Sequence, residues 1–358
     1  MRVLHVVGAR PNFMKLAPTF RALAKRKNVQ QVVVHTGQHY DASMSDVFFG
    51  ELGLNSPDIN LRVGSGTHAQ QTAQIMERFE PVVQEQRPDL VLVYGDVNST
   101  VAAALVCAKL LVRVGHVEAG LRSRDRSMPE EINRLLTDQI SDLLFTPSQD
   151  ADQNLVREGI PSERIFFVGN VMIDTLVELM PQAEKRVPRG LPARFALVTL
   201  HRPSNVDDLV WLQNMLGALE QIGQGLAVLF PLHPRTRKKL SEVAGAASPN
   251  GVRFLDPLPY IDFIGLESKA SVVITDSGGI QEETTFLGIP CLTVRENTER
   301  PITVECGTNT IVGRDTDRLQ AAVQHIVAGA TPNRRLQSRI PLWDGRAAER
   351  IAEVIASL

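Results

Sequence analysis

The sequence predicts an α/β protein made of two Rossmann-like domains, each a doubly wound parallel sheet, that face each other across a central cleft. Three observations lead to this prediction. Short apolar segments alternate with longer amphipathic ones along nearly the whole chain, which is typical of repeated strand and helix units. The chain has 358 residues, a length that favours two domains. A charged stretch containing Pro and Gly, Pro181–Pro192, separates two such series and is interpreted as a linker.

The first series predicts six buried strands with amphipathic helices between them. The strands are nearly continuous apolar runs, as expected of a parallel sheet that is covered on both faces. The predicted strands are Arg2–Val7, Gln31–Thr36, Leu90–Tyr94, Arg113–Val117, Leu143–Thr146 and Ile165–Val168. The predicted helices are Pro18–Lys27, His68–Gln86, Thr100–Leu111, Glu130–Ile140 and Ser148–Glu158.

The second series repeats the same alternation, and the chain then ends in one more helical pattern, Asp344–Ser357. The predicted strands are Phe195–Leu200, Leu226–Phe230, Val252–Leu255, Ser271–Thr275, Cys291–Val294 and Thr310–Val312. The predicted helices are Asp207–Ile222, Pro234–Ala244, Tyr260–Ser268, Ile280–Leu287 and Asp315–Ala328. Ligands of such folds bind at the carboxyl ends of the strands, which is where the unusual residues of this chain fall.

The composition argues against several classes of partner. A net charge of −2 and a pI near 6.5 give no indication of a nucleic-acid or anionic-membrane partner. Cys107, Cys291 and Cys306 lack CxxC spacing, which argues against a disulfide framework or a zinc site and for a reducing compartment. The first apolar run is too short for a signal peptide, and no run approaches membrane-spanning length. We therefore expect a cytoplasmic protein with no metal centre, no nucleic-acid partner and no membrane partner.

The clearest candidate for a ligand site is Thr275–Glu283, where the pattern predicts a strand, a tight glycine turn and a helix. Gly278 and Gly279 allow the backbone to approach a ligand closely, and Ser277 adds a hydroxyl at the start of the helix. The free amides and the positive end of the helix dipole suit a diphosphate. Glu283 lies just inside the helix, where it could accept hydrogen bonds from a sugar diol. The alternative is an ordinary Asp or Ser helix cap followed by a glycine turn.

The turn after the first strand carries two cations, Arg10 and Lys15, one helical turn apart across a rigid proline. The planar guanidinium group of Arg10 suits phosphate oxygens. The turn lacks the GxGxxG pattern, so the sequence does not support a nicotinamide site. The alternative is a solvated arginine in a loop and a lysine at the start of a helix.

Three carboxylates, Asp96, Glu118 and Glu130, are expected at one place in the first half. Asp96 follows a buried strand at a glycine turn, and Glu118 directly follows the next strand, where an unpaired charge would be costly. Glu130 comes directly after a proline that starts a helix. The alternatives are a helix-capping role for Asp96, a structural ion pair between Glu118 and Arg122, and a simple interaction of Glu130 with the helix dipole.

In the second half, His201 and His233 each follow a predicted strand. A histidine at such a position is often a partly buried structural residue, so neither is specific by itself. The basic run Arg235–Lys239 is interpreted as a solvated helix face. His5 and His35 are interpreted as structural.

Taken together, these motifs resemble the non-hydrolysing UDP-N-acetylglucosamine 2-epimerases. The resemblance runs along essentially the whole chain in a specific order. Its motifs in the first half are Gly8-Ala9-Arg10-Pro11 with Lys15, Thr36-Gly37-Gln38-His39, Gly95-Asp96, Gly115–Arg122, Pro129–Arg134 and Gly169-Asn170. Those in the second half are Thr199-Leu200-His201-Arg202, Asp276–Glu283 and Thr298-Glu299-Arg300-Pro301.

The resemblance implies a glycosyltransferase-B-type fold, a homodimer, a UDP-N-acetylhexosamine substrate and no cofactor. The last helix is expected to return to the first domain, giving domains at 1–170 with 344–358 and at 171–343. The resemblance assigns catalytic roles to Asp96, Glu118, Glu130, His201 and Lys15. It assigns UDP or substrate binding to Arg10, Arg134, Phe263, Ser277, Gly278, Gly279, Glu283 and Arg300.

The chain departs from the family pattern at three places. Asn12 and Phe13 stand where Glu-Ala is commoner after Arg-Pro. Tyr40-Asp41-Ala42-Ser43 stands where substrate-activated bacterial members carry Arg, Glu or Gln, Met and Leu, which argues against their allosteric site. Pro203-Ser204-Asn205 replaces Arg-Glu-Asn, so the sugar specificity can differ.

The reaction that the resemblance implies is elimination of UDP to a 2-acetamidoglucal, followed by readdition. Four alternatives remain at this point: a glycosyltransferase on the same scaffold, a hydrolysing epimerase, a nucleotide-sugar sensor, and a 2-epimerase of a UDP-2,3-diacetamido-uronic acid.

Overall fold

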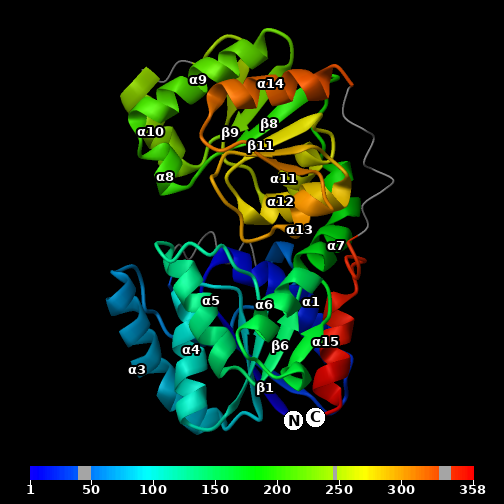
Figure 1. The fold of residues 1–358 in the computed structure, drawn as a ribbon. Helices are drawn as coiled ribbons and strands as arrows, with labels where there is room; N and C mark the ends of the chain where they lie inside the picture. Colours follow the sequence, from blue (N-terminus) through cyan, green and yellow to red (C-terminus); the bar gives the residue numbers. More distant parts are fainter. Residues whose placement is uncertain (39–49, 245–247, 330–339) are drawn as a thin grey trace. The chain divides into compact units, whose positions relative to one another are not determined.

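The computed structural model describes residues 1–38, 50–244, 248–329 and 340–358, and its chain forms two compact units (Figure 1). Unit 1 comprises Met1–Thr175 and Pro341–Leu358, and unit 2 comprises Leu176–Ile340. The domain limits expected from the sequence were residues 170 and 344. The boundary between unit 1 and unit 2 instead falls inside helix α7, Val171–Lys185.

Unit 1 contains a seven-stranded parallel sheet in the order β3-β2-β1-β4-β5-β6-β7. The strands are β1 Arg2–Val7, β2 Gln30–His35, β3 Ile59–Asn60, β4 Leu90–Tyr94, β5 Arg113–Val117, β6 Leu143–Thr146 and β7 Ile165–Phe167. The helices are α1 Arg10–Ala24, α3 His68–Gln86, α4 Asn98–Lys109, α5 Pro129–Ile140, α6 Gln149–Arg157 and α15 Ala347–Ala356, with the 3-10 helix η1 at Ser162–Arg164. The central strands β1 and β4 are buried along almost their whole length, as expected of strands covered on both faces. β4 is accordingly apolar throughout, whereas β1 also contains Arg2 and the buried His5.

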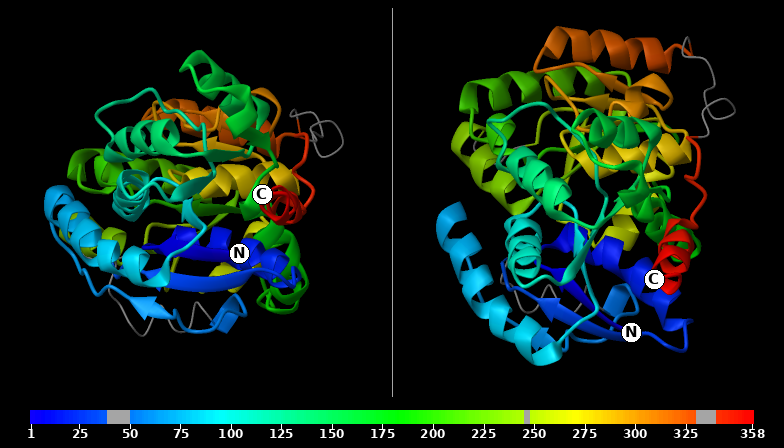
Figure 2. Two further views of the ribbon diagram at one scale, coloured as in Figure 1. Left: turned by 90° about the horizontal axis from the view of Figure 1, so that it is seen from below. Right: turned by 60° about the horizontal axis from the view of Figure 1, so that its bottom comes forward.

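The last helix of the chain, α15, belongs to unit 1 (Figure 2). It packs against α1, and its first turn is capped by Asp174, which accepts hydrogen bonds from the amides of Ala347 and Ala348. Trp343, just before the helix, donates its indole N–H to the Pro147 carbonyl. Burial of Ile351 and Ile355 fixes one face of the helix in the core.

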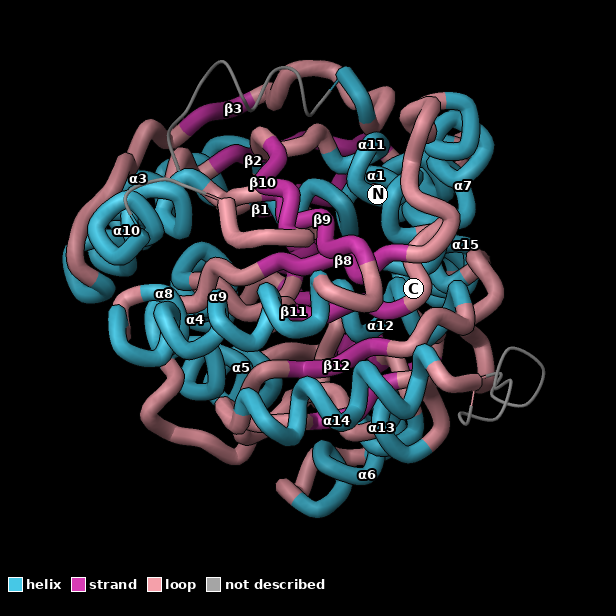
Figure 3. Tube along the Cα trace, turned by 90° about the horizontal axis from the view of Figure 1, so that it is seen from above, coloured by secondary structure: helices cyan, strands magenta, loops and turns pink. Residues whose placement is uncertain are grey.

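Unit 2 contains a six-stranded parallel sheet in the order β10-β9-β8-β11-β12-β13 (Figure 3). The strands are β8 Phe195–Thr199, β9 Ala227–Pro231, β10 Val252–Leu255, β11 Val272–Thr275, β12 Cys291–Thr293 and β13 Asn309–Ile311. The helices are α8 Pro203–Val206, α9 Leu209–Gly223, α10 Pro234–Ala244, α11 Tyr260–Glu267, α12 Gly278–Leu287, α13 Ile302–Glu305 and α14 Thr316–Val327. One core packs α9 and α14 against the sheet, and a second one includes residues of α11 and α12.

Two expectations about helix ends were wrong, because each placed the end of a helix at a proline that lies inside one. The first helix begins at Arg10, not at Pro18, because Pro11 occupies its first turn, where a missing N–H costs nothing, while Pro18 lies inside it. The expected linker begins at Pro181, but α7 continues through that proline to Lys185. Tertiary packing therefore keeps two helices intact across a residue that usually ends them.

None of the helices in the described ranges combines the length and the hydropathy that a membrane crossing requires.

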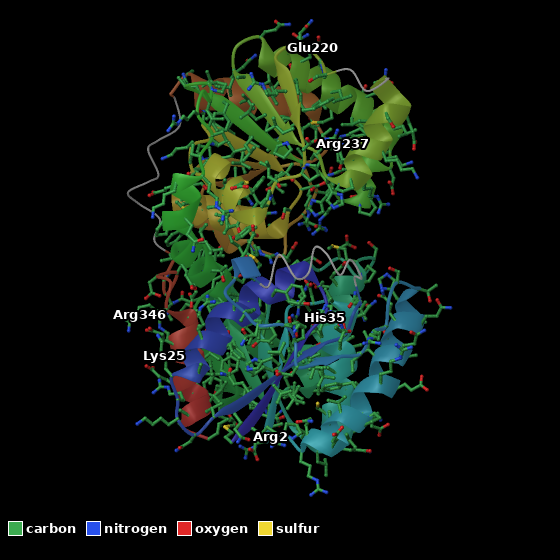
Figure 4. The ribbon with its side chains drawn as sticks, turned by 180° about the vertical axis from the view of Figure 1, so that it is seen from behind. Arg2, Lys25, His35, Glu220, Arg237 and Arg346 are labelled. Atoms are coloured by element: carbon green, nitrogen blue, oxygen red, sulfur yellow. The ribbon has the colours of Figure 1, made fainter. Side chains whose placement is uncertain are left out.

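Two buried histidines predict how stability depends on pH. Burial lowers the pKa of His5 and of His35 from 6.5 to about 4. His35 lies at the carboxyl end of the sheet in unit 1, opposite to Arg2 (Figure 4). A pKa of about 4 in place of 6.5 corresponds to roughly 3 kcal/mol per histidine. Because the folded protein resists protonation, this stability is complete above pH 6.5 and is lost as the pH falls toward 4.

Thermal melts between pH 7.5 and pH 4.5 test this expectation. His35→Gln is expected to flatten the decline in melting temperature, because it removes one of the two groups. His325→Gln, which alters an exposed histidine of α14, is the matched control and is expected to keep the wild-type slope. An unchanged slope in the His35 variant would contradict the assignment.

Candidate functional site

The carboxyl end of β5 presents Glu118 to Lys15, and both side chains are buried in the resulting ion pair. The backbone of Glu118 has a φ of 74°, in the left-handed region that a non-glycine residue rarely adopts. Gly95, at the end of β4, also has a positive φ, and a Cβ there would lie 2.7 Å from Lys15 Nζ. The turns after β4 and β5 are therefore shaped around this ion pair.

The alternative ion pair between Glu118 and Arg122 is wrong. Arg122 instead contacts Asp138, at 2.7 Å, and donates two hydrogen bonds to Glu158. Glu118 is thus held by a cation from helix α1, the same helix whose first turn carries the predicted phosphate-binding residue.

Asp96 does not cap the helix that follows it but binds Arg134 from α5, at 2.5 Å from its Oδ2 atom. The side chain of Asp96 is 31% exposed, whereas that of Arg134 is almost fully buried. Arg134 also pairs with Glu131 at 2.8 Å. The guanidinium group of Arg134 therefore pairs with two carboxylates, the partly exposed one of Asp96 and the buried one of Glu131.

Glu131 has a structural role that the sequence did not reveal. Its carboxylate accepts hydrogen bonds from the amides of Ser123 and Arg124. Burial opposes ionisation, but these amides and Arg134 prevail and lower the pKa of Glu131. Glu130 is exposed in the same first turn of α5, and within the described ranges no hydrogen bond or ion pair involves its side chain. Of the two adjacent acids, only Glu130 therefore remains open to a ligand.

Beneath these turns, His116 of β5 connects two acceptors. One ring nitrogen lies 2.6 Å from Asp138 and the other 2.7 Å from the Gly95 carbonyl. Burial opposes ionisation of Asp138, but the charges and hydrogen bonds of His116 and Arg122 lower the pKa of this carboxyl. Asn133 adds a hydrogen bond to the Asp96 carbonyl. The strand-end residues of unit 1 are thus fixed by a largely buried hydrogen-bond network.

Unit 2 has a comparable arrangement around Asp276, which is fully buried after β11. Its carboxylate accepts hydrogen bonds from the amides of His201 and Arg202 and from the side chain of Asn205. Burial opposes ionisation, but His201 and these donors lower the pKa of Asp276. The turn after β8 is therefore tied to the turn after β11.

The start of α12 has no side-chain cap. Ser277 is the N-cap residue, but within the described part of the chain its hydroxyl makes no capping hydrogen bond. Asp276 cannot cap the helix, because its oxygens are directed to the turn after β8. The alternative of an ordinary capped helix is therefore excluded, and the helix-terminal amides are placed to bind an anion.

Arg300 adds a buried cation at this helix terminus. Its guanidinium group contacts Glu282 at 2.8 Å and Glu299 at 2.6 Å. A Cβ on Gly278 would lie 2.6 Å from the Glu299 carboxylate and closer still to Arg300. Burial opposes ionisation of Glu299, but Arg300 and Arg295 hold its pKa well below the usual range. Gly278 is required here because the ion pair occupies the space of a side chain.

His201 is accessible to solvent, with 41% of its side chain exposed. Its Nδ1 atom lies 2.9 Å from Asp276, and its ring is 6.0 Å from that of His233. Because the Asp276 carboxylate only accepts hydrogen bonds, Nδ1 carries a proton and Nε2 remains available for other partners.

The remaining predicted residues of unit 2 lie on α11 and α12. Gly279 is half-buried in the first turn of α12. Phe263 is half-buried on α11 and packs against the second core. Glu283 is buried, and its Oε1 atom accepts a hydrogen bond of 2.5 Å from the Tyr260 hydroxyl.

Some of the predicted features lie outside the described residues. Arg10 begins α1, but its side chain is outside the described part, as is the departure from the family pattern at Tyr40–Ser43. Within the described ranges no group of three or more His, Cys, Asp or Glu side chains is arranged to hold a metal ion.

Sequence reasoning missed several residues that position the site. Asn12 accepts hydrogen bonds from the amides of Gly8 and Ala9 and donates one to the Tyr94 carbonyl, so it fixes the first turn. Glu131 and Glu299 were not predicted as site residues, whereas their neighbours Glu130 and Arg300 were. The only available signal was an arginine within three or four positions of each acid, which predicts a pair but not its burial.

Comparisons with known proteins show the family to which the chain is similar. A family model described as UDP-N-acetylglucosamine 2-epimerase matches residues 21–356. A UDP-N-acetylglucosamine 2-epimerase of Methanocaldococcus jannaschii is 42% identical over 369 residues, covering 99% of each chain. A UDP-2,3-diacetamido-2,3-dideoxy-D-glucuronate 2-epimerase of Pseudomonas aeruginosa is 41% identical over 362 residues, covering 100% of each chain.

A solved structure supports the same relationship. The crystal structure of the M. jannaschii UDP-GlcNAc 2-epimerase in complex with UDP-GlcNAc and UDP superposes with a TM-score of 0.91, at 40% identity and over 100% of both chains. The predicted fold class, two α/β domains with parallel sheets, is thereby confirmed. The chain belongs to the UDP-N-acetylglucosamine 2-epimerase family.

Proposed function

We propose that this protein interconverts UDP-GlcNAc and UDP-ManNAc by eliminating UDP to a 2-acetamidoglucal and adding it back. The observation that carries this proposal is the set of carboxylates at the strand ends of unit 1, with Asp96 bound to Arg134 and Glu118 bound to Lys15. A protein that only bound an anionic nucleotide sugar would avoid such acids. The relatives named as 2-epimerases support the same reaction.

The chemistry requires two kinds of group. C2 of an N-acetylhexosamine has no adjacent carbonyl carbon, so its proton is not acidic enough for direct removal. In the elimination, a base takes the C2 proton, the C–H electrons form the C1–C2 double bond, and UDP departs with the electrons of its bond to C1. In the reverse step, UDP attacks C1 and a proton adds to the opposite face of C2. The enzyme must therefore bind a departing diphosphate and supply both a base and an acid.

We assign diphosphate binding to Ser277, Gly278, Gly279 and His201 of unit 2 and to Arg10 of unit 1. This assignment is supported by the uncapped start of α12 and the exposed ring of His201. Glu283 would hold the ribose, and Phe263 and Arg300 would border the nucleotide. A basic anion site stabilises the charge that develops on the leaving UDP.

We assign proton transfer at C2 to Asp96 together with Glu118 or Glu130. Lys15 and Arg134 orient two of these acids and would also contact the sugar. We further propose that the enzyme is a homodimer, which the resemblance implies. We also propose that it acts in the cytoplasm, because its three cysteines are free thiols, as is typical of a reducing compartment.

Incubation of the purified protein with UDP-GlcNAc tests the function directly. The anomeric proton signals of UDP-ManNAc are expected to appear in the NMR spectrum until a constant ratio is reached, and the same mixture is expected from UDP-ManNAc. No change in the nucleotide sugar would contradict the proposal, and release of free N-acetylmannosamine would point to a hydrolysing epimerase.

A second candidate is favoured by the Pseudomonas relative, because its identity of 41% nearly equals the 42% of the M. jannaschii enzyme. UDP-2,3-diacetamido-2,3-dideoxy-D-glucuronate differs from UDP-GlcNAc by an acetamido group at C3 and a carboxylate in place of the hydroxymethyl group. Measuring kcat/KM for both substrates decides between them. A value at least ~100-fold higher for UDP-GlcNAc, as expected when the site makes no pair for the extra carboxylate, favours the first proposal.

A further inference from the structure

Glu267 of α11 is a buried acid to which the proposed reaction gives no role. It is 0% exposed, and among the described residues no donor reaches either of its carboxyl oxygens. Its neighbours along the chain, Leu266 and Ala270, belong to the second core of unit 2. An ionised carboxylate in such surroundings is costly unless it is paired, so Glu267 is expected to be the neutral acid.

The group that faces Glu267 is another carboxyl, that of Glu283. Burial and the charge and proximity of Glu283 raise the pKa of Glu267 well above its ordinary value. Two ionised carboxylates only accept hydrogen bonds, so they cannot bond to each other unless one carries a proton. A single proton on Glu267 supplies the donor for a hydrogen bond between the two carboxyl groups.

The other titratable groups around the pair leave this proton in place. The thiol of Cys291 on β12 is buried near Glu267, and burial raises its pKa to about 12, so it is neutral. Tyr260, one turn of α11 before Phe263, donates its hydroxyl to Glu283 Oε1. Glu283 thus receives one hydrogen bond from Tyr260 and is placed to receive a second one from Glu267.

We propose that Glu267 is a positioning residue that donates its carboxyl proton to Glu283 and so orients the Glu283 carboxylate toward the two ribose hydroxyls of UDP. This inference rests on the proposed function, which makes Glu283 the ribose ligand. A carboxylate offers about four lone-pair positions, and the direction from which Tyr260 and Glu267 donate to two of them sets the edge of the group that a diol meets. Because Glu283 is only 2% exposed, a ligand meets one edge of its carboxylate, and the orientation of that edge decides the contact.

A comparison of two ligands on three variants separates this role from a general structural one. The affinities of UDP and of 2′,3′-dideoxy-UDP, which lacks the ribose diol, are measured by calorimetry. Glu267→Met removes the donor while keeping a side chain of similar length, and it is expected to weaken UDP binding by about 10-fold, the value of one charge-assisted hydrogen bond. The same variant is expected to bind dideoxy-UDP as the wild type does.

Glu267→Gln is the matched control, because its amide restores a donor to Glu283, and it is expected to recover the UDP affinity. The melting temperature supplies a second readout. Replacing an isolated buried acid by Met is expected to leave stability unchanged or to raise it, so the loss of affinity does not follow from unfolding. If the Met variant fails to fold, Glu267→Asp, which withdraws the acid by one methylene, is expected to show the same selective loss.

The possible failures are distinguishable. Equal affinities for UDP in the wild type and the Met variant, or equal losses for both ligands, would overturn the role of Glu267 while leaving the proposed function intact. A wild-type protein that did not bind UDP at all would contradict the proposed function itself, and this inference with it.

Discussion

Replacing Glu118 by Gln is expected to lower kcat for 2-epimerisation by at least ~100-fold, the low end of what a general acid or base contributes. Glutamine keeps the size and the hydrogen-bonding capacity of the side chain, so it can still accept a hydrogen bond from Lys15. It can neither take a proton from C2 of the sugar nor give one to it. The left-handed backbone at position 118 is strained for both residues alike, so the fold is expected to survive. Asp96→Asn is expected to have an effect of the same size.

Asp142→Asn is the matched control for these variants. Asp142 accepts a hydrogen bond from the Val114 amide, at 2.8 Å, near the amino end of the strand that Glu118 terminates. The control removes one carboxylate charge that lies next to the same strand, β5. We expect its kcat to equal that of the wild type. Turnover near the wild-type rate in both the Glu118 and Asp96 variants would show that these acids do not transfer the C2 proton.

Replacing Gly278 by Ala is expected to weaken UDP binding by ~5- to ~150-fold, which corresponds to the ~1–3 kcal/mol of an overpacked site. The added methyl group would lie 2.6 Å from Glu299 and would collide with Arg300. Both are buried and bound to each other, so neither can move without breaking an ion pair. Calorimetric titration with UDP measures the effect.

The same substitution at Gly217 is the matched control. Gly217 lies in helix α9 of the same unit, and a Cβ there would meet nothing within 4 Å. Gly217→Ala is expected to leave the UDP affinity unchanged and to raise the melting temperature, because alanine favours the helix. If the two variants bound UDP equally well, the start of α12 would not be the diphosphate site.

The fold was predictable from the sequence because its signals are local. Strands such as Leu90–Tyr94 are continuous apolar runs between glycine turns and helical patterns, and the structure places that strand at the same residues. Errors occurred where tertiary contacts override a local rule, as at Pro18 and Pro181, which lie inside helices that packing holds together. The two-residue strand β3 has too little sequence to give any pattern.

Candidate site residues could be singled out from the sequence where their position in the chain was unusual. Asp96, Glu118 and Ser277 each follow a buried strand, and a charged or polar residue there has few structural explanations. Their partners were not predictable, because pairing depends on contacts between distant residues. Arg134 reaches Asp96 across 38 positions, and Lys15 reaches Glu118 from another helix. Glu267 stands in a mostly apolar helix, α11, but this helix contains a second acid, Asp262, and the carboxyl partner Glu283 lies on another helix, α12.

The measurement that tests the central claim most directly follows hydrogen exchange at C2 in D₂O. UDP-GlcNAc is incubated with the enzyme, and the C2 proton signal and free UDP are monitored by NMR. Elimination and readdition predict that the C2 signals of both UDP-GlcNAc and UDP-ManNAc disappear as deuterium enters from the solvent. UDP-ManNAc that forms with its original C2 proton retained, or a glycosyl transfer without exchange, would contradict this account.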